Sequence, residues 1–549
     1  MKPRPAARSG PPFRRILVAN RGEIAVRIIR ACRELGVETV AVYSDADATA
    51  LHVRLADAAV RIGPPPPTES YLRIEAVVEA ALRTGAEAIH PGYGFLSERA
   101  AFARAVEAAG LVFVGPPVAA IEALGDKLAA RRLARSVGVE PVPGTLEPAP
   151  VDAAGDLDAL LAAAEAVGFP LLVKAAAGGG GRGMRRVGEP KDLPAALAAG
   201  SAEARSAFGD GSVYLEREIR PARHVEVQLL GDRFGEVVAL GERDCSIQRR
   251  HQKLVEEAPA PGLHPDERRA LHERAVALGR AAGLANAATV EFLRDEAGRF
   301  WFLEVNTRLQ VEHPVSELVS GVDIVHEQLW LAAGAPLSAA VREAAERALD
   351  PDRHAIEVRI SAEDPGRDFV PTPGRVGVWR MPAGPGVRVD TAIEAGERVP
   401  PEYDNLIAKC IVVGPDRATA IARLRRALAE AEISGIQTTL PFHRAVAADP
   451  AFAAAELSTD WVAERYDPRG DRLRAARVAA VAAGLAATGP RLTAAAPAAP
   501  AGSPIGGGPG SPTAPSTSVS GAGTRRDSHP WRRAGREAAL DRWPDRWSG

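Results

Sequence analysis

The sequence has few cysteines, and their placement excludes two classes of protein. Only three of its 549 residues are cysteine, and Cys32, Cys245 and Cys410 lie far apart in the chain. An odd number of widely spaced cysteines fits neither a disulfide-stabilised secreted domain nor a CxxC metal or redox motif. The simplest expected location is therefore the reducing cytoplasm.

Long apolar runs and an excess of one charge are also absent. No stretch of about 18 uncharged apolar residues occurs, so the sequence predicts no helix that spans a membrane. Residues 1–15 are basic but contain no apolar core, which argues against a secretory signal. The 68 basic and 70 acidic side chains give a net charge of −2, which excludes a dedicated polyelectrolyte binder.

The sequence does have the composition of a large folded protein. Hydrophobic residues make up 46% and charged residues 25%, as in globular domains. Ile16 to Ala19 predicts a buried strand, a helix with one apolar face follows up to Gly36, and residues 37–43 predict a second strand. This order indicates a βαβ unit of a parallel sheet. Its first turn, residues 20–23, lacks GxGxxG, so we expect no dinucleotide site there.

A glycine-rich segment follows Lys174. Residues 169–174 predict a strand, residues 178–181 are four glycines, and residues 184–187 predict a second strand. The run matches GxGxxG formally, but a strand follows instead of a helix, and the Gly-Lys-Ser/Thr of a Walker A loop is absent. The pattern predicts a hairpin tip whose backbone N–H groups approach phosphate oxygens, with Lys174 and Arg182 beside it. The alternative is a surface hairpin that binds nothing.

Residues 288–314 predict a hairpin with a polar face. From Trp301 to Glu312 mostly apolar residues at odd positions alternate with mostly polar residues at even positions, the exceptions being Thr307 and Phe302, which predicts one core face and one polar face. An ordinary exposed strand alternates in the same way, so this pattern alone leaves both interpretations open.

The register of this hairpin decides whether two carboxylates meet. A turn that pairs Arg294 with Arg299 places Glu291 opposite Phe302 and diagonal to Glu304, with the Cβ atoms of the two glutamates about 7 Å apart. Such a pair, with Asn306 next along, suits Mg²⁺ bridging substrate phosphates. A three-residue loop would instead turn Glu291 to the other face.

The segment 242–253 concentrates cations. Acidic residues flank it and no aromatic residue interrupts it, so an anionic small substrate fits better than a nucleic acid. Within it, Cys245 is expected to be a buried small hydrophobic residue and not a nucleophile. His224, taken alone, is expected to be structural.

Taken together, several long strings resemble the biotin carboxylase component of biotin-dependent acyl-CoA carboxylases, of the acetyl-CoA or propionyl-CoA carboxylase alpha type. They are Ile-Leu-Val-Ala-Asn-Arg-Gly-Glu-Ile-Ala (16–25), His-Pro-Gly-Tyr-Gly-Phe-Leu-Ser-Glu (90–98), the glycine loop after Lys174, and residues 242–261, 304–314 and 354–365. The similarity runs from about residue 13 to residue 466.

The resemblance implies a multidomain fold of α/β and α+β parts. The expected parts are a Rossmann-like pre-ATP-grasp domain (13–125), an ATP-grasp domain (126–335) with a mobile glycine-rich lid at about 145–215, and a C-terminal biotin carboxylase domain (345–466). Around them we expect a disordered arm (1–12), a helical extension (467–489) and a disordered linker or tail without a biotinyl domain (490–549).

The resemblance also implies an activity. The family carboxylates N1′ of biotin on a carrier protein with bicarbonate and ATP, through carboxyphosphate, and uses Mg²⁺ or Mn²⁺. The implied nucleotide contacts are Lys127, Lys174, Gly179, Gly180, Gly181, Glu216, Arg217, Ile219, His224, Gln248 and His251. The implied metal ligands are Glu291, Glu304 and Asn306, and the implied bicarbonate pocket is Lys253, Arg308, Gln310, Val311 and Glu312.

Four of the matching residues carry catalytic roles in this resemblance: Glu312, Arg359, Lys253 and Arg308. Glu312 matches the base that deprotonates bicarbonate, and Arg359 matches the residue that stabilises the biotin enolate. Tyr93 matches a residue of the biotin site, and Asp404 resembles one near biotin or the dimer interface. Two departures are Ala177, where the family usually has another glycine, and Arg217, where it more often has lysine.

The implied partners are a second copy of the chain, a biotin carboxyl carrier protein or domain, and a carboxyltransferase subunit, with neither nucleic acid nor membrane. No Ala-Met-Lys-Met biotinylation sequence follows residue 490, so we expect the biotin to come from another protein. Two alternatives remain at this point. One is another bicarbonate-activating ATP-grasp ligase, such as a carbamoyl-phosphate synthase half, and the other is a catalytically silent subunit.

Overall fold

The computed structural model describes residues 10–149, 157–176, 184–488 and 545–547. The chain divides into two compact units, one formed by residues 1–468 with 544–549 and the other by residues 469–543. The only described element of the second unit is helix α17 (Arg469–Thr488), where a helical extension is expected. Among the described residues, none of the helices has both the length and the apolar character needed to cross a bilayer.

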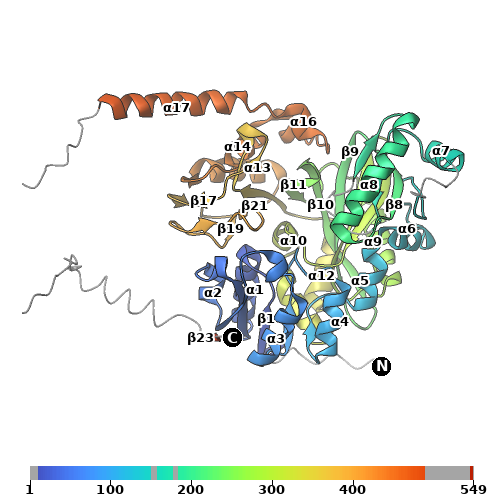
Figure 1. Cartoon of the computed structure of the whole chain (residues 1–549), viewed down its shortest axis with the longest axis horizontal. Coiled ribbons are helices and arrows are strands. Elements are labelled where there is room, and N and C mark those ends of the chain that lie inside the picture. The colour runs from blue at the N-terminus through green and yellow to red at the C-terminus, as the bar shows by residue number, and fades with distance from the viewer. Residues whose placement is uncertain (1–9, 150–156, 177–183, 489–544, 548–549) are drawn as a thin grey trace, which may run out of the picture. The chain divides into compact units, whose positions relative to one another are not determined.

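The N-terminal domain is a parallel sheet with the strand order β3-β2-β1-β4-β5 (blue in Figure 1). Strand β1 pairs with β2 and with β4 in parallel, which confirms the predicted βαβ unit. The elements are β1 (Arg15–Val18), α1 (Gly22–Glu34), β2 (Glu38–Ser44), α2 (Leu51–Leu55), β3 (Ala58–Gly63), α3 (Ile74–Thr84), β4 (Ala88–His90), α4 (Ala100–Ala108), β5 (Val112–Phe113) and α5 (Val118–Gly125).

The expectation of a wholly disordered tail is wrong at three residues. Strand β23 (Asp545–Trp547) pairs in parallel with β3 and adds a sixth strand to this sheet. An edge strand presents unpaired backbone N–H and C=O groups to any extended segment, whatever the composition around that segment. Composition therefore could not reveal this pairing. The rest of the tail lies outside the described residues.

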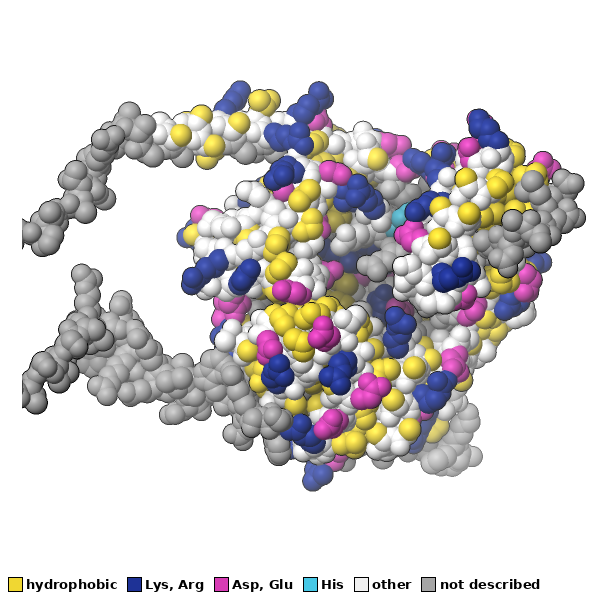
Figure 2. Space-filling model, in the orientation of Figure 1, with side chains coloured by type: hydrophobic (Ala, Val, Ile, Leu, Met, Phe, Trp, Pro, Cys, Tyr) yellow, Lys and Arg dark blue, Asp and Glu magenta, His cyan; other side chains and the backbone are white. Residues whose placement is uncertain are grey.

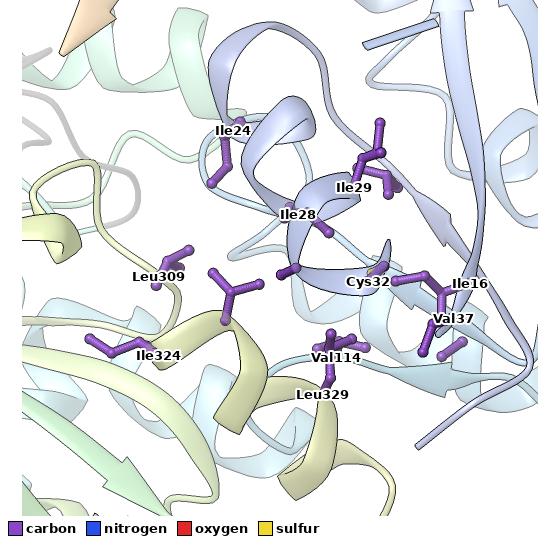
Figure 3. Close-up of a cluster of buried hydrophobic side chains, with 14 of the residues drawn as sticks. Ile16, Ile24, Ile28, Ile29, Cys32, Val37, Val114, Leu309, Ile324 and Leu329 are labelled. Carbon is purple, nitrogen blue, oxygen red and sulfur yellow. The ribbon is translucent and has the colours of Figure 1, made fainter. Parts of the chain in front are cut away.

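One apolar cluster joins this sheet to the segment that carries much of the candidate site. Ile24, Ile28 and Cys32 lie on the buried face of α1, as their spacing predicts. Figure 3 shows Leu309 pointing into the same cluster, and its side chain is fully buried. Leu309 therefore anchors residues 307–312 to the N-terminal domain.

The central feature is an eight-stranded antiparallel sheet with the order β13-β12-β9-β10-β11-β14-β21-β19. It runs without a break through the segments expected as the ATP-grasp and C-terminal domains, because β11 pairs with β14. Its strands are β9 (Ala222–Gly231), β10 (Val237–Arg249), β11 (Gln252–Ala258), β12 (Asn286–Asp295), β13 (Phe300–Asn306), β14 (His354–Ser361), β19 (Val387–Thr391) and β21 (Leu406–Gly414).

Helices cover this sheet. They are α9 (Pro265–Ala281), α10 (His313–Ser320), α11 (Ile324–Ala332), α12 (Ala339–Arg347), α13 (Arg417–Glu430), α14 (Leu440–Ala448), α15 (Pro450–Ala453) and α16 (Trp461–Arg465). Helix α6 (Lys127–Ser136) packs near β13. On the face drawn in Figure 2, lysine and arginine are interspersed with aspartate and glutamate, in keeping with the balanced net charge.

The predicted register of the β12–β13 hairpin is wrong in a way that brings the two carboxylates closer. Arg294 pairs with Phe300 instead of Arg299, and a bulge leaves Leu303 without a partner between two paired positions. The altered turn shifts the pairing by one residue, and the bulge shifts it by one more. Because two shifts of one residue cancel in their effect on side-chain direction, Glu291 and Glu304 stay on the same face of the sheet. Glu291 consequently lies directly opposite Glu304.

The bulge also ends the strict alternation expected from Trp301 to Glu312. Phe300, Phe302 and Val305 are buried, whereas Trp301 and Leu303 are half-buried. The strand ends at Asn306, and residues 307–312 form a connection to α10. A bulge moves side chains to the other face, so alternation counted from the sequence alone loses its phase there.

The segment expected to form the lid has a sheet and core of its own. Strand β6 (Leu171–Ala175) lies between β7 (Arg185–Val187) and β8 (Val213–Arg217), all antiparallel. Helices α7 (Leu157–Val167) and α8 (Leu193–Phe208) accompany them. Leu171, Val173 and Leu215 belong to an apolar cluster separate from that of the large sheet. Such a separate core suits a part that moves as a unit, and its mobility stays a prediction.

The three thiols are expected to resist modification in the folded protein. Cys32, Cys245 and Cys410 are free and fully buried. Burial raises the pKa of each thiol, that of Cys410 to about 12, and thiolate is the reactive form. Titration with an aromatic disulfide should therefore detect no fast-reacting thiol in native protein and three after denaturation. A fast-reacting native thiol would contradict the burial.

Candidate active site

A row of charged side chains crosses four neighbouring strands of the large sheet. Arg243 on β10 pairs with Glu226 on β9, Glu226 pairs with Glu291 on β12, and Glu291 pairs with Glu304 on β13. Like charges directly across from one another destabilise a sheet. Three adjacent glutamates therefore require cations between them, and the surrounding side chains supply these.

Lys253 is the cation at the centre. Its Nζ lies 2.5 Å from Glu226 Oε2, 2.8 Å from Glu291 Oε1 and 2.7 Å from Glu312 Oε1. Burial would lower the pKa of Lys253, but the three carboxylates raise it well above its usual value. The side chain is therefore charged, and its ammonium group donates one hydrogen bond to each of the three carboxylates.

Glu312 occupies the position just before α10 and is fully buried. One carboxylate oxygen accepts from Lys253, and the other accepts from Arg359 at 2.9 Å. Burial works against its ionisation, yet Lys253, Arg359 and Arg243 hold the pKa of Glu312 well below the usual value. Glu312 is thus a charged carboxylate between two cations, at the edge of the glutamate row.

The connection between β13 and α10 brings polar side chains to the same point. Asn306 and Gln310 donate to Glu291 Oε1 at 2.7 Å and 3.1 Å. Arg308 donates to Gln310 Oε1 at 2.8 Å and to Asn306 Oδ1 at 3.0 Å. These contacts hold the guanidinium of Arg308 beside the ring of acids, where it can meet an anion.

The backbone of Val311 is fixed by a buried lysine of the C-terminal domain. Lys409 on β21 donates to the Val311 carbonyl at 2.9 Å and lies 3.2 Å from Glu23 Oε1. Tyr93 donates a hydrogen bond to the same Glu23. The segment before Glu312 is therefore held by β21 on one side and by Leu309, packed against α1, on the other.

A second group of predicted residues is built around two lysines. Lys127 at the start of α6 contacts Glu304. Lys174 on β6 donates to Glu216 Oε1 at 2.7 Å, and Arg131 donates to the other oxygen of Glu216 at 2.8 Å. Both lysines therefore have a carboxylate partner in this structure. Gly179, Gly180 and Gly181 lie outside the described residues.

The other predicted nucleotide residues lie along β8, β9 and the β10–β11 turn. Arg217 ends β8 with its side chain exposed, and Ile219 follows it. His224 Nε2 lies 3.0 Å from Glu291 Oε2, so this histidine contacts the glutamate row. Gln248 is buried near the end of β10.

His251 lies in the turn after β10, with a backbone φ of 65°. Burial, together with the charges of Lys174 and His224, lowers its pKa. A neutral imidazole at this position can accept a hydrogen bond from a ligand hydroxyl or ammonium group.

Tyr93 and Asp404 are the two remaining predicted residues, and they lie outside the large sheet. Burial raises the pKa of Tyr93, and the charges of Glu23, Asp404 and Arg359 also act on it, so these groups are near neighbours. Asp404 Oδ1 accepts from the backbone N–H of Leu406 at 2.7 Å, which caps the start of β21. The structure therefore brings Tyr93 and Asp404 to the Arg359 side of the site.

Glu291, Glu304 and Asn306 supply oxygen atoms, the ligand type that magnesium prefers. Glu291 and Glu304 face each other across the hairpin, and Mg²⁺ prefers carboxylate oxygen together with phosphate oxygen. Burial opposes ionisation of both, but Lys253 and His224 lower the pKa of Glu291 well below its usual value, and Lys127 lowers that of Glu304. Both acids are therefore charged.

Three important residues of the site were missed from the sequence: Glu226, Arg243 and Glu256. A signal existed for the first, because His224, Glu226 and Gln228 alternate with Val225, Val227 and Leu229 and so share a face of β9. For Arg243, the sequence indicated only that it belongs to the cationic segment 242–253. Its guanidinium donates to Glu226 Oε1 at 2.5 Å.

Comparison with known proteins agrees with this geometry. Family models match along the chain: the biotin carboxylase N-terminal domain over residues 12–121, the carbamoyl-phosphate synthase L chain ATP-binding domain over residues 126–340, and the biotin carboxylase C-terminal domain over residues 357–464. The flanking matches separate this chain from carbamoyl-phosphate synthase, whose name the middle model carries.

Similar proteins match over most of this chain. The biotin carboxylase of Nostoc sp. is 48% identical over 452 residues, 82% of this chain and 99% of that protein. The propionyl-CoA carboxylase alpha chain of Ruegeria pomeroyi is 45% identical, over 83% of this chain and 69% of its own. The biotin carboxylase domain of Hydrogenobacter thermophilus 2-oxoglutarate carboxylase, solved as a dimer with MgADP, ADP and bicarbonate, has a TM-score of 0.78 and 44% identity, over 82% of this chain and 97% of that one. The chain belongs to the biotin carboxylase family.

Proposed function

We propose that this protein carboxylates biotin on a carrier protein or domain, with bicarbonate and ATP as co-substrates. The observation that carries the proposal is the placement of Glu312, an ionised carboxylate whose two oxygens contact Lys253 and Arg359. A base held between two cations suits an anion that must be bound and then deprotonated. Lys253 also contacts Glu226 and Glu291, members of the glutamate row that is expected to hold the nucleotide's metal.

Bicarbonate binding is assigned to Lys253, Arg308, Gln310 and the backbone of Val311. When bicarbonate enters, its negative charge replaces part of the carboxylate charge that now neutralises Lys253. Glu312 then accepts the hydroxyl proton of bicarbonate, and the fixed geometry of the two groups lowers the entropic cost of that transfer. The carbonate oxygen attacks the γ-phosphorus of ATP, which forms carboxyphosphate and releases ADP.

Carboxyphosphate then breaks into CO₂ and phosphate. Phosphate takes the proton from N1′ of biotin, and the nitrogen attacks CO₂, so the atoms and charges balance. Arg359 is assigned to the oxygen of the enolate that develops on the ureido group, with Tyr93 lining the biotin side. Catalysis here consists mainly of positioning and charge stabilisation, as in other phosphoryl transfers.

The nucleotide contacts are assigned to Lys127, Lys174, Glu216, Arg217, Ile219, His224, Gln248 and His251, with the glycines at 179–181 over the phosphates. Glu291, Glu304 and Asn306 would hold Mg²⁺ or Mn²⁺. Bound there, the metal would neutralise charge on the phosphate oxygens. Lys127 and Lys174 would exchange their present carboxylate partners for phosphate oxygens.

The proposed partners are a second copy of this chain, a biotin carboxyl carrier protein or domain, and a carboxyltransferase subunit. The dimeric structure of a 44% identical relative supports the first of these. The acceptor of the second half-reaction is proposed to be an acyl-CoA bound by the carboxyltransferase. Three free, buried thiols support a reducing compartment such as the cytoplasm.

Replacement of Arg359 by alanine tests the proposed activity. We expect free biotin to stimulate bicarbonate-dependent ATP hydrolysis by the native protein, and we expect this stimulation to disappear in Arg359→Ala. Hydrolysis without biotin should persist in the variant, because Lys253 and Glu312 remain. Steady-state release of ADP, measured with and without biotin, gives the biotin-stimulated and the biotin-independent rates of hydrolysis.

Arg380→Ala is the matched control, because that arginine belongs to the same domain and its side chain is 72% exposed. Hydrolysis by the native protein that is indifferent to biotin would instead favour another bicarbonate-activating ligase. No hydrolysis in a folded, nucleotide-binding protein would favour a catalytically silent subunit.

A further inference from the structure

Arg359 is shared between two buried carboxylates. Its Nε donates to Glu256 Oε1 at 2.5 Å, and one terminal nitrogen donates to Glu312 Oε2 at 2.9 Å. Both glutamates are fully buried. Only Glu312 has a proposed part in the chemistry, so the role of Glu256 remains to be explained.

The backbone of Arg359 is held independently of these acids. Its carbonyl accepts from Thr439 Oγ1 at 2.9 Å and lies 2.6 Å from His443 Nε2. The start of the side chain is therefore fixed by α14 and the residue before it, whereas its guanidinium is fixed by Glu256 and Glu312 alone among the hydrogen bonds described.

Glu256 belongs to a charged layer on one face of the sheet. It pairs across β11 and β14 with Glu357, which lies two residues before Arg359, and Arg359 pairs with Lys409 on β21. Among the described residues, Glu256 Oε2 and both carboxylate oxygens of Glu357 have no hydrogen-bond partner. A buried carboxylate without other partners is costly. The contact with Arg359 is therefore the principal one that Glu256 makes.

In the proposed reaction, Glu312 accepts a proton and loses its negative charge. A neutral carboxyl holds a guanidinium much less strongly than a carboxylate does. Arg359 would then lose one of its two partners at the moment when the biotin oxyanion begins to form. Without a second anchor, its long side chain could leave the geometry that this step needs.

We infer that Glu256 is a positioning residue for the biotin step: it keeps the guanidinium of Arg359 in place when Glu312 is protonated, so that the terminal nitrogen released by Glu312 can meet the ureido oxygen of biotin. This inference rests on the proposed function.

The charges around Glu256 act in the same direction. The charged neighbours of Glu256 are Arg359 and Glu357 on β14, Glu312 just before α10, and Lys253 on the same strand as Glu256. Lys409 on β21 is a charged neighbour of Glu357. Burial raises the pKa of Glu256 to about 7, Arg359 opposes this, and the charge of Glu312 adds to it. Protonation of Glu312 removes that charge, lowers the pKa of Glu256 and strengthens its hold on Arg359.

The test replaces Glu256 by glutamine in the full chain. The expected result is a loss of about 10²-fold in kcat for biotin-dependent ATP hydrolysis, as for other small displacements of a catalytic group. The KM for ATP and the rate without biotin should stay at native values. Glu357→Gln is the matched control, because it makes the same change on the same layer at a carboxyl that does not contact Arg359 through a hydrogen bond.

Three outcomes would overturn the inference. Glu256→Gln could keep the native biotin-dependent rate, it could lose both rates equally, or Glu357→Gln could lose the biotin step to the same extent. If Glu256→Gln does not fold, the pH profile of the native protein decides. The ratio of biotin-dependent to biotin-independent rate should fall as pH drops below about 7, where Glu256 becomes neutral, and an unchanged ratio would overturn the inference. Failure of the proposed function is distinct, because the native protein would then show no biotin stimulation.

Discussion

Replacing Glu312 by glutamine is expected to abolish bicarbonate-dependent ATP hydrolysis while nucleotide binding remains. The glutamine keeps the shape of the side chain but cannot accept the proton of bicarbonate. Loss of a positioned general base costs about 10²- to 10⁴-fold in rate. Steady-state ADP release with saturating bicarbonate measures the effect, and titration with a fluorescent ATP analogue measures nucleotide binding.

The structure explains why this loss should be specific. Glu312 contacts Lys253 and Arg359 but not Lys127 or Lys174, the lysines assigned to phosphates. Glu432→Gln is a matched control, because that side chain is 54% exposed and lies in the C-terminal domain. Native-level hydrolysis by Glu312→Gln would show that a different group accepts the bicarbonate proton.

Replacing Lys253 by methionine is expected to destabilise the protein by about 3–5 kcal/mol, as for other buried ion pairs that lose one partner. Methionine fills a similar volume but leaves Glu226, Glu291 and Glu312 with no shared cation. Those side chains are all nearly or fully buried. The midpoint of thermal or urea unfolding measures the effect, and Lys191→Met, at a lysine whose side chain is 75% exposed, is the control.

The pH dependence of this loss has a definite sign. In the native protein, burial opposes ionisation, but Lys253 and other cations depress the pKa values of Glu291 and Glu312 well below their usual values. The stability that these two acids contribute is therefore present at neutral pH and is lost only on acidification through those low pKa values. Without Lys253, fewer cations oppose the effect of burial, so the two acids contribute less stability at neutral pH.

The difference in stability between native protein and Lys253→Met should accordingly be largest at neutral pH and shrink as pH falls below about 4, from the ordinary glutamate pKa toward the depressed ones. A difference that is independent of pH would show that lost packing, and not the loss of the cation that three carboxylates share, accounts for the destabilisation.

Local periodicity predicted the elements of the site but not their register. The β1–α1–β2 unit and the β12–β13 hairpin follow from apolar spacing and from turn residues. The exact pairing of Glu291 with Glu304 does not, because it depends on the four-residue connection 296–299 and on a bulge at Leu303. Turn length and bulges depend on packing against both faces of the sheet, and the sequence of a single strand does not encode that packing.

Partners far apart in the chain were also beyond sequence reasoning. Glu226 shows a strand alternation that could have placed it on the face of His224, yet nothing local links Glu256 to Arg359, 103 residues away. The link exists because β11 lies beside β14 in one sheet, and that adjacency joins two segments expected to be separate domains. Likewise the strand Asp545–Trp547 appears only because β3 offers a free edge.

The sequence by itself determined the residue types of the site, the strands and helices that carry them, and, through long motifs, the family resemblance. These depend on local chemistry: alternation for strands, a 3.6-residue period for helices, and oxygen or cationic side chains for phosphate and metal. Only the tertiary structure decided which charges meet, so that three glutamates converge on Lys253 and two converge on Arg359. The physical reason is that a charge can stay buried only beside its counter-charge, and the strand order of the sheet sets which counter-charges lie within reach.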